Sequence, residues 1–317
     1  MRGLYTEKVE KAPIPFEELV REILRDGDRK VTLVEQFCDD GEGKVNRYNV
    51  YKIYTNDKAY VLKKSDAAEI HVYEKLLNGQ SLPVPECYGA VEWNGRKWIL
   101  LAYAEGTDLR DFTEDMAYAC AMSITQSMNR YWQEKCEDFA RNKLDDRFER
   151  YWERINRRAK CLKGEPVLKQ AYEVFLTRQL TEPRTLCNGD FLQFNALYNN
   201  EKVTIIDWAF GGIMPYALDI ARLIAHGTED KRTFPFYMTD AYREIYVQQV
   251  YEKLEHKPEY ERYLLDIKLA LLNECIEFIE RELNDVSRER DHVFEYYYEK
   301  AQTLAEEIIR CNLECRH

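Results

Sequence analysis

One stretch, residues 186–207, constrains the chain most, because it sets three polar residues among apolar runs. Asp190 is followed five positions later by Asn195 and twelve positions after that by Asp207. Residues 203–206 have the character of a short buried strand that ends at Asp207. Residues 199–202, Asn-Asn-Glu-Lys, predict a turn, so Asn195 and Asp207 are expected on the two arms of a hairpin, where they can converge.

A carboxylate and a carboxamide that converge offer two oxygen ligands to Mg²⁺, which needs few protein ligands when phosphates supply the rest. Asp190 would then stand nearby as a base, and this layout predicts a phosphoryl-transfer site. Singly, Asp190 and Asp207 have ordinary alternative roles as a turn residue or a helix cap. Their joint spacing, with a lysine-bearing strand before them and helices after them, favours the functional interpretation.

Composition limits the class of protein. The chain has 317 residues, enough for two lobes, and a formal net charge of -11, which argues against a nucleic-acid-binding surface and leans weakly towards cationic ligands. Nine scattered cysteines without a Cys-x-x-Cys pair, and only five histidines, support neither a disulfide framework nor a zinc site. Reduced thiols, and no signal-peptide or membrane-spanning pattern, predict a cytoplasmic protein with no nucleic-acid or membrane partner.

Residues 1–103 are predicted to form an N-terminal nucleotide-binding lobe with a five-stranded antiparallel sheet and one inserted helix. The connections between its strands are too short for parallel crossovers, which indicates antiparallel pairing. The expected helices cover residues 16–24 and 67–77, and the expected strands cover 31–37, 47–55, 58–63, 88–92 and 96–102.

Residues 104–317 are predicted to form a helical C-terminal lobe with the catalytic loop and the acceptor-binding helices. The segments have helical periodicity and little Gly or Pro. The expected helices cover residues 113–139, 145–161, 166–180, 219–225, 240–254, 260–283 and 286–313. The two lobes together predict an α+β, bilobal fold.

Lys63 is the candidate cationic clamp for phosphates. Strand alternation places Lys63 on the face of Val61 and Lys64 on the opposite face. A lysine that points inward needs a carboxylate, and Glu69 on the next predicted helix is preferred over Glu74. The alternative is a solvated strand end.

Gly41 and Gly43, in the acidic loop at residues 38–44, could bring backbone amides close to a phosphate. The alternative is a plain hairpin loop, because the motif has no third glycine and its acids would repel phosphate.

Four acids in the helical part are candidates for binding a cationic acceptor: Glu229, Asp230, Glu274 and Glu277. Glu274 and Glu277 are three residues apart and share a helix face. The alternative for each of them is a solvated helix face. Arg222 receives no role from the sequence.

The residues of the central stretch also resemble a known motif. Asn188-Gly189-Asp190, followed by Asn195 and then by Ile-Asp-Trp at 206–208, is similar to the His-Gly-Asp-x-x-x-x-Asn and Ile-Asp-Trp pattern of the aminoglycoside phosphotransferase and choline kinase-like family. Similar segments stand at residues 60–63, 82–85, 100–109 and 215–221. The resemblance runs from about residue 30 to about residue 225.

The resemblance implies a protein kinase-like fold, Mg²⁺, and ATP or GTP as co-substrate. It implies the following roles: Asp190 as catalytic base, Asn195 and Asp207 as Mg²⁺ ligands, Lys63 and Glu69 on the nucleotide phosphates, Ala102 and Ala104 at the adenine edge, and Asp219 as a structural tie to the loop. One departure is that Asn188 replaces the motif histidine, which buttresses the loop in the family. The kinase Gly-x-Gly-x-x-Gly loop and an Ala-Pro-Glu segment are also missing, which argues against a eukaryotic-type protein kinase.

Three functional hypotheses follow. The first is an O-phosphotransferase acting on a small, cationic, hydroxylated molecule of the aminoglycoside type. Within the enzyme class, a choline or ethanolamine kinase, another small-metabolite kinase, or a sporulation-associated kinase-like protein stays open. From another class, Asn188 leaves open a catalytically silent, nucleotide-binding protein with a kinase-like fold.

Overall fold

The computed structural model describes residues 4–41, 44–133, 147–230, 236–285 and 287–314. The chain divides into two compact units. The first contains Met1–Gly106 and Thr204–Ala209, and the second contains Thr107–Val203 and Phe210–His317. Each unit has its own cluster of buried apolar side chains.

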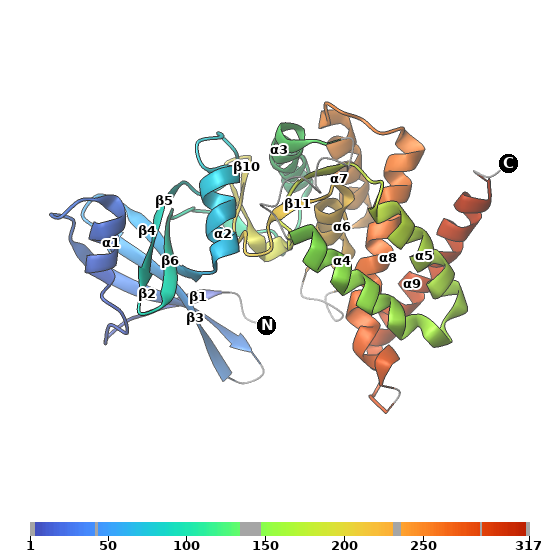
Figure 1. Ribbon diagram of the computed structural model, residues 1–317, viewed down its shortest axis with the longest axis horizontal. Helices are drawn as coiled ribbons and strands as arrows, with labels where there is room; N and C mark the ends of the chain where they lie inside the picture. The colour runs from blue at the N-terminus through green and yellow to red at the C-terminus, as the bar shows by residue number, and fades with distance from the viewer. Residues whose placement is uncertain (1–3, 42–43, 134–146, 231–235, 286, 315–317) are drawn as a thin grey trace. The chain divides into compact units, whose positions relative to one another are not determined.

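The first unit is built on an antiparallel six-stranded sheet with the order β1-β2-β3-β4-β6-β5 (Figure 1). The predicted class, an antiparallel sheet followed by helices, is confirmed, and the sheet has one strand more than expected. Its strands are β1 (Tyr5–Lys8), β2 (Val31–Gly41), β3 (Lys44–Thr55), β4 (Ala59–Ser65), β5 (Cys87–Trp93) and β6 (Arg96–Ala102).

The additional strand, β1, is a polar edge strand that pairs with β2. The Tyr5 hydroxyl donates to Asp40 Oδ1 at 3.0 Å, and the Thr6 hydroxyl donates to Glu35 Oε2 at 3.0 Å. A four-residue strand held by backbone pairing and polar contacts has no apolar alternation. The sequence pattern therefore could not reveal it.

Helix α1 (Phe16–Leu24) covers one face of this sheet. Its buried residues, Phe16, Leu19 and Val20, pack against a cluster that includes Tyr51 and Trp98. The rings of Phe16 and Tyr51 meet edge to face with centroids 4.8 Å apart. Tyr60 and Leu62 of β4 belong to this cluster, so strand alternation places Lys63 on the opposite face of the sheet.

The predicted helix at 67–77 begins as α2 (Ala67–His71) and continues as π-helical turns over Val72–Leu77. Asp66 caps it, because its Oδ1 accepts the Glu69 backbone N–H at 2.7 Å. The cap fixes the first turn, on which Glu69 is buried.

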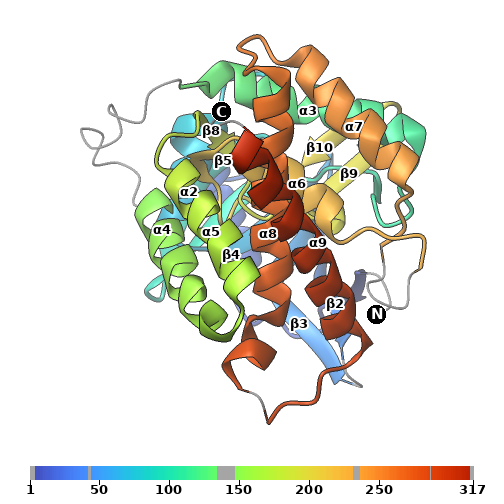
Figure 2. The same cartoon turned by 90° about the vertical axis from the view of Figure 1, so that its right-hand side faces the viewer.

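The second unit is mainly helical. Figure 2 shows the long helices α8 and α9 side by side, with α5 next to α9. Its helices are α3 (Glu114–Tyr131), α4 (Arg147–Arg158), α5 (Pro166–Gln179), α6 (Ala217–Ala225), α7 (Asp240–Lys253), α8 (Tyr260–Asn284) and α9 (His292–Glu314). Its short strands are β7 (Thr107–Asp108), β8 (Arg184–Cys187), β9 (Ala196–Asn199), β10 (Lys202–Ile205) and β11 (Gly212–Pro215), and the unit boundary falls within β10.

Two predicted helix boundaries are wrong. The helix expected to start at residue 113 ends at Tyr131, because Trp132 has extended backbone angles. The last helix begins at His292 rather than at 286, because Asp291 Oδ1 accepts the backbone N–H groups of Val293 and Phe294 at 3.0 Å each. Residues 134–139, 145–146 and 286 of the predicted helices lie outside the described residues.

Among the helices that the structure describes, none combines the length and the apolar character that a bilayer span requires. The cysteines in the described ranges are free thiols, and all of them except Cys311 are buried.

Candidate active site

Lys63 on β4 is held between two carboxylates of the first unit. Its Nζ lies 2.7 Å from Glu69 Oε1 and 2.7 Å from Asp207 Oδ1. The Glu69 side chain is 2% exposed and that of Asp207 is 46% exposed. A fixed ammonium next to a solvent-facing carboxylate is suited to hold phosphate oxygens and their metal ion.

The charge on Lys63 is maintained despite its burial. Burial lowers the pKa of the Lys63 ammonium, but Asp207 and Glu69 raise it by more, so the net change is upward. Burial raises the pKa of Glu69, and Lys63 opposes that change. The lysine is therefore a permanent cation at neutral pH.

Asp207 is positioned by the buried end of β10. The Ile205 N–H donates to the Pro83 carbonyl at 2.8 Å, and the indole N–H of buried Trp208 donates to the Ile205 carbonyl at 3.1 Å. Asp207 itself adopts a φ of 54°, in the left-handed region. These anchors turn the backbone so that the Asp207 carboxylate reaches Lys63.

The catalytic loop of the second unit is tied to α6 through Asp219. The backbone N–H groups of Asn188 and Gly189 donate to Asp219 Oδ2 and Oδ1 at 2.5 and 2.9 Å. Burial raises the pKa of Asp219 to about 7, although these two amide donors oppose the change. This is the structural position that the resemblance implied for Asp219.

Asn188, the residue that departs from the family motif, has a part in ordering the loop. Its side chain is fully buried, and its Oδ1 accepts the Asp190 backbone N–H at 3.2 Å. An amide at this position therefore braces the residue next to it in the loop. The substitution of the motif histidine leaves the loop ordered.

Gly189 cannot be replaced without moving the loop. Its φ is +78°, and a Cβ added to it would lie 2.3 Å from the carbonyl oxygen of Phe210. Only glycine combines this backbone conformation with so close an approach.

Asp190 is held by a donor on each carboxylate oxygen. Arg222 donates to Oδ1 from Nη2 at 2.8 Å and from Nε at 3.2 Å. Asn195 Nδ2 donates to Oδ2 at 3.2 Å and to the Asp190 carbonyl at 2.7 Å. The carboxylate is 23% exposed, so it remains accessible to a ligand.

The residues predicted to bind Mg²⁺ fit a hard cation in their donor chemistry. Asn195 directs Nδ2 at Asp190 and has an amide oxygen as a second polar atom, and Asp207 contributes a half-exposed carboxylate; both are oxygen donors of the kind that Mg²⁺ prefers. Asn195 and Asp207 flank the hairpin of β9 and β10, as expected. They belong to different units, and their joint binding of a metal stays a prediction.

Two of the predicted acceptor acids lie in internal ion pairs. Glu274 is 3% exposed, and its Oε2 contacts Arg222 Nη1 at 2.5 Å. Glu277 Oε2 lies 2.7 Å from Nη2 of Arg158, a buried residue. Sequence reasoning expected Glu274 and Glu277 on one acceptor-facing surface and did not assign Arg222, although Arg222 stands one helical turn after Asp219. A role of either glutamate in acceptor binding stays a prediction.

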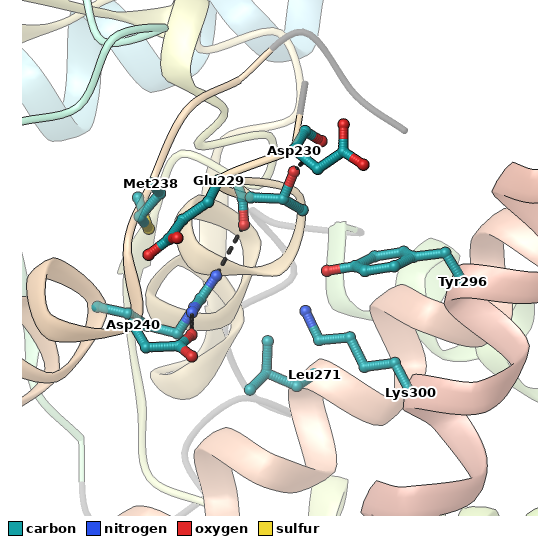
Figure 3. A pocket seen from close by; sticks show the side chains of 10 residues that line it. Glu229, Asp230, Met238, Asp240, Leu271, Tyr296 and Lys300 are labelled. Carbon is teal, nitrogen blue, oxygen red and sulfur yellow. Dashed lines mark hydrogen bonds and ion pairs between the residues drawn. The ribbon is translucent and has the colours of Figure 1, made fainter. Parts of the chain in front are cut away.

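The other two predicted acids, Glu229 and Asp230, line a cavity of about 530 Å³ in the second unit. Figure 3 shows Tyr296 and Lys300 extending from α9 towards the segment that carries these acids. Lys300 Nζ donates to the Ala225 carbonyl at 2.9 Å, and burial lowers the pKa of this ammonium.

Four further residues of the first unit are predicted to contact the nucleotide, and the structure describes three of them, Gly41, Ala102 and Ala104. Ala102 ends β6, and its N–H donates to the Glu86 carbonyl at 2.8 Å. Ala104 lies in the segment after β6, and Gly41 ends β2. Gly43 lies outside the described residues. Nucleotide contacts by these residues stay predictions.

The first unit carries a buried lysine–glutamate pair and the second an accessible aspartate in a braced loop, and both are features of kinase-like transferases. Residues 41–262, more than half of the chain, match the model of the phosphotransferase enzyme family. The chain therefore belongs to this family of phosphotransferase enzymes, and the predicted family relationship is confirmed.

Solved structures with the same fold are distant in sequence. They include an aminoglycoside phosphotransferase from Alicyclobacillus acidocaldarius (TM-score 0.58, 13% identity, covering 95% of this chain and 97% of that one) and an ethanolamine kinase from Plasmodium vivax (0.53, 14%, 86% and 81%). Another is the amicoumacin kinase hAmiN in complex with AMP-PNP, Ca²⁺ and Ami (0.54, 15%, 81% and 85%). At this identity the likeness shows the fold alone. No curated protein matches the chain in sequence.

Proposed function

We propose that the protein transfers the γ-phosphate of ATP or GTP to a hydroxyl group of a small, cationic molecule. The observation that carries this proposal is Asp190, an accessible carboxylate fixed by one donor on each oxygen. Such a group can accept a proton in a fixed direction. The free thiols support a cytoplasmic location as part of the same proposal.

In the proposed reaction Asp190 orients the acceptor hydroxyl and accepts its proton. The acceptor oxygen forms a bond to the γ-phosphorus while the bond from that phosphorus to the bridging oxygen breaks, and the nucleoside diphosphate leaves with the electron pair. Lys63, kept in place by Glu69, would bind the nucleotide phosphates. Asn195 and Asp207 would hold Mg²⁺, which when bound neutralises phosphate charge. The AMP-PNP complex of amicoumacin kinase supports a nucleotide co-substrate.

The acceptor class is proposed from the cavity. Its wall carries three acids, Glu229, Asp230 and Asp240, and two cations, Arg243 and Lys300. The excess of acids would attract a protonated amine, which favours an aminoglycoside-type acceptor. The ethanolamine kinase with the same fold supports a second candidate, choline, ethanolamine or another small amine-bearing alcohol.

The proposal is tested with the purified protein and its isosteric Asp190→Asn variant, supplied with MgATP or MgGTP. The acceptors are a panel of aminoglycosides, amino sugars, choline and ethanolamine, and the product is detected by phosphorus NMR. We expect one acceptor class to be phosphorylated by the native protein and at least 100-fold more slowly by the variant. Equal inertness of both proteins, with nucleotide binding intact, would instead support a silent nucleotide-binding protein.

A further inference from the structure

Arg222 links the proposed base to a buried carboxylate that lies deeper in the second unit. Its Nε and Nη2 donate to Asp190 Oδ1, while its third contacting nitrogen, Nη1, meets Glu274. The guanidinium therefore bridges two acids, one accessible and one buried. Because the guanidinium is rigid and planar and binds a carboxylate along each of two edges, it fixes both the distance and the orientation of the Asp190 carboxylate.

Glu274 is in turn fixed so that it can serve as the anchor for Arg222. His226 Nε2 lies 3.4 Å from Glu274 Oε2, and His226 Nδ1 lies 2.8 Å from the Tyr297 hydroxyl oxygen. Burial lowers the pKa of His226, so the ring is neutral at pH 7. A carboxylate only accepts, so the proton belongs on Nε2, and Nδ1 then accepts the Tyr297 hydroxyl.

The charge state of the anchor is also defined. Burial raises the pKa of Glu274, but Arg222 and His226 together lower it by more, so the pKa of this carboxyl group lies below its ordinary value. Glu274 is therefore an anion throughout the physiological range. Its contacts with Arg222 and His226 both lie within the second unit, so the negative charge of Glu274 holds the Arg222 guanidinium in place.

We propose that Arg222 is a positioning residue for phosphoryl transfer, which holds the Asp190 carboxylate in its reactive orientation and is itself held by Glu274 and His226. The inference rests on the proposed function in taking Asp190 as the base. It assigns Glu274, expected from sequence to face the acceptor, to the support of the base. Arg222 holds one oxygen of the Asp190 carboxylate and Asn195 holds the other, which fixes the direction from which the acceptor hydroxyl can approach.

The second unit contains a matched control for a purely structural ion pair. Arg178 donates to Asp266 from Nε at 2.7 Å and from Nη2 at 2.8 Å, and Asp266 is fully buried. Arg178→Lys and Arg222→Lys both keep the charge, so both proteins are expected to fold, and both lose the planar fork. Only Arg222→Lys alters a contact with Asp190, the proposed base.

The experiment compares these two variants, and Arg222→Met, in two assays. The first is steady-state release of inorganic phosphate from MgATP alone, in which water replaces the acceptor, with KM for MgATP determined in parallel. The second is hydrogen–deuterium exchange of peptides covering residues 188–195. The amides of this loop are protected by defined bonds, including those from Asn188, Gly189 and Asp190, so loosening is measurable.

We expect Arg222→Lys to lower kcat roughly 10-fold and Arg222→Met roughly 100-fold, with KM for MgATP within about twofold of the native value. Exchange in residues 188–195 should rise in both Arg222 variants and remain native in Arg178→Lys. Native exchange in the Arg222 variants, or an equal rise in Arg178→Lys, would overturn the inference. Absence of phosphate release by the native protein would count against the proposed function, while the exchange data would still decide whether Arg222 positions Asp190.

Discussion

Glu182 makes the stability of the second unit depend on pH in an unusual direction. The side chain has no exposure to solvent, and it accepts hydrogen bonds from Gln179 Nε2 at 2.8 Å and from the Ala217 N–H at 3.0 Å. Burial, followed by the charge of Asp266, raises its pKa from 4.5 to about 8. The native protein therefore keeps Glu182 protonated at neutral pH.

The sign of the effect follows from proton binding. Because the folded-state pKa lies above the unfolded value, the native state binds more protons between pH 4.5 and 8, and the free energy of unfolding falls as the pH rises through this window. At about 1.4 kcal/mol per pH unit, the interval between the two pKa values corresponds to about 5 kcal/mol. Glu182→Gln keeps the shape and one of the two acceptor oxygens, turns an NH₂ group towards the other N–H donor, and removes this dependence.

Thermal unfolding followed by circular dichroism, from pH 5 to pH 8.5, tests this reasoning. We expect Glu182→Gln to be less stable than the native protein at pH 5 by about 1–3 kcal/mol, because one buried N–H group loses its acceptor. As the pH rises to 8.5, the difference in Tm should shift in favour of the variant by roughly 10 °C. Glu173→Gln is the control, because that side chain is 65% exposed. A difference between Glu182→Gln and the native protein that stays constant across the pH range would refute the argument.

Three further predictions concern the site. Lys63→Met should lower kcat/KM for the nucleotide about 100-fold, because a fixed cation aimed at the phosphates is lost; steady-state kinetics measures this. Asn188→Ala should lower the free energy of unfolding by about 1–2 kcal/mol and reduce kcat, because the Asp190 N–H loses its acceptor; thermal unfolding and kinetics measure this. Glu229→Gln and Asp230→Asn should each raise KM for a cationic acceptor by up to about fivefold, with KM for nucleotide unchanged.

Each of these predictions has an outcome that contradicts it. For Lys63, the control is Lys64→Met on the opposite strand face, and equal effects of the two changes would remove the special role of Lys63. For Asn188, native stability and kcat in the alanine variant would show that the loop does not depend on the amide. For the cavity acids, an unchanged KM for every cationic acceptor would place the acceptor elsewhere.

Much of the first unit was predictable, because its determinants are local. Strand alternation put Lys63 on the face of Val61, and the short connection after β4 put Glu69 in the first turn of the following helix, where it meets Lys63. The same holds for the hairpin that Asn195 and Asp207 flank. In each case the partners are fixed by the geometry of adjacent elements.

The network around Arg222 was not predictable in the same way. Arg222 and Glu274 are 52 residues apart, and their pairing depends on how α6 packs on α8. On sequence alone Glu274 is one acid among many on a charged helix, and nothing local separates a buried acid from a solvated one. Glu182 was missed for the same reason, since only tertiary burial raises its pKa.

The membership of Thr204–Ala209 in the first unit has a consequence for biosynthesis. The Pro83 carbonyl receives its hydrogen bond from Ile205, and Lys63 receives one of its two carboxylates from Asp207. During translation these partners follow nearly one hundred residues that belong to the other unit, so the first unit cannot complete its structure when its own sheet emerges. A fragment ending at Gly106 should therefore be less stable than its six paired strands suggest, because the first unit stays incomplete until residues 204–209 have been synthesised.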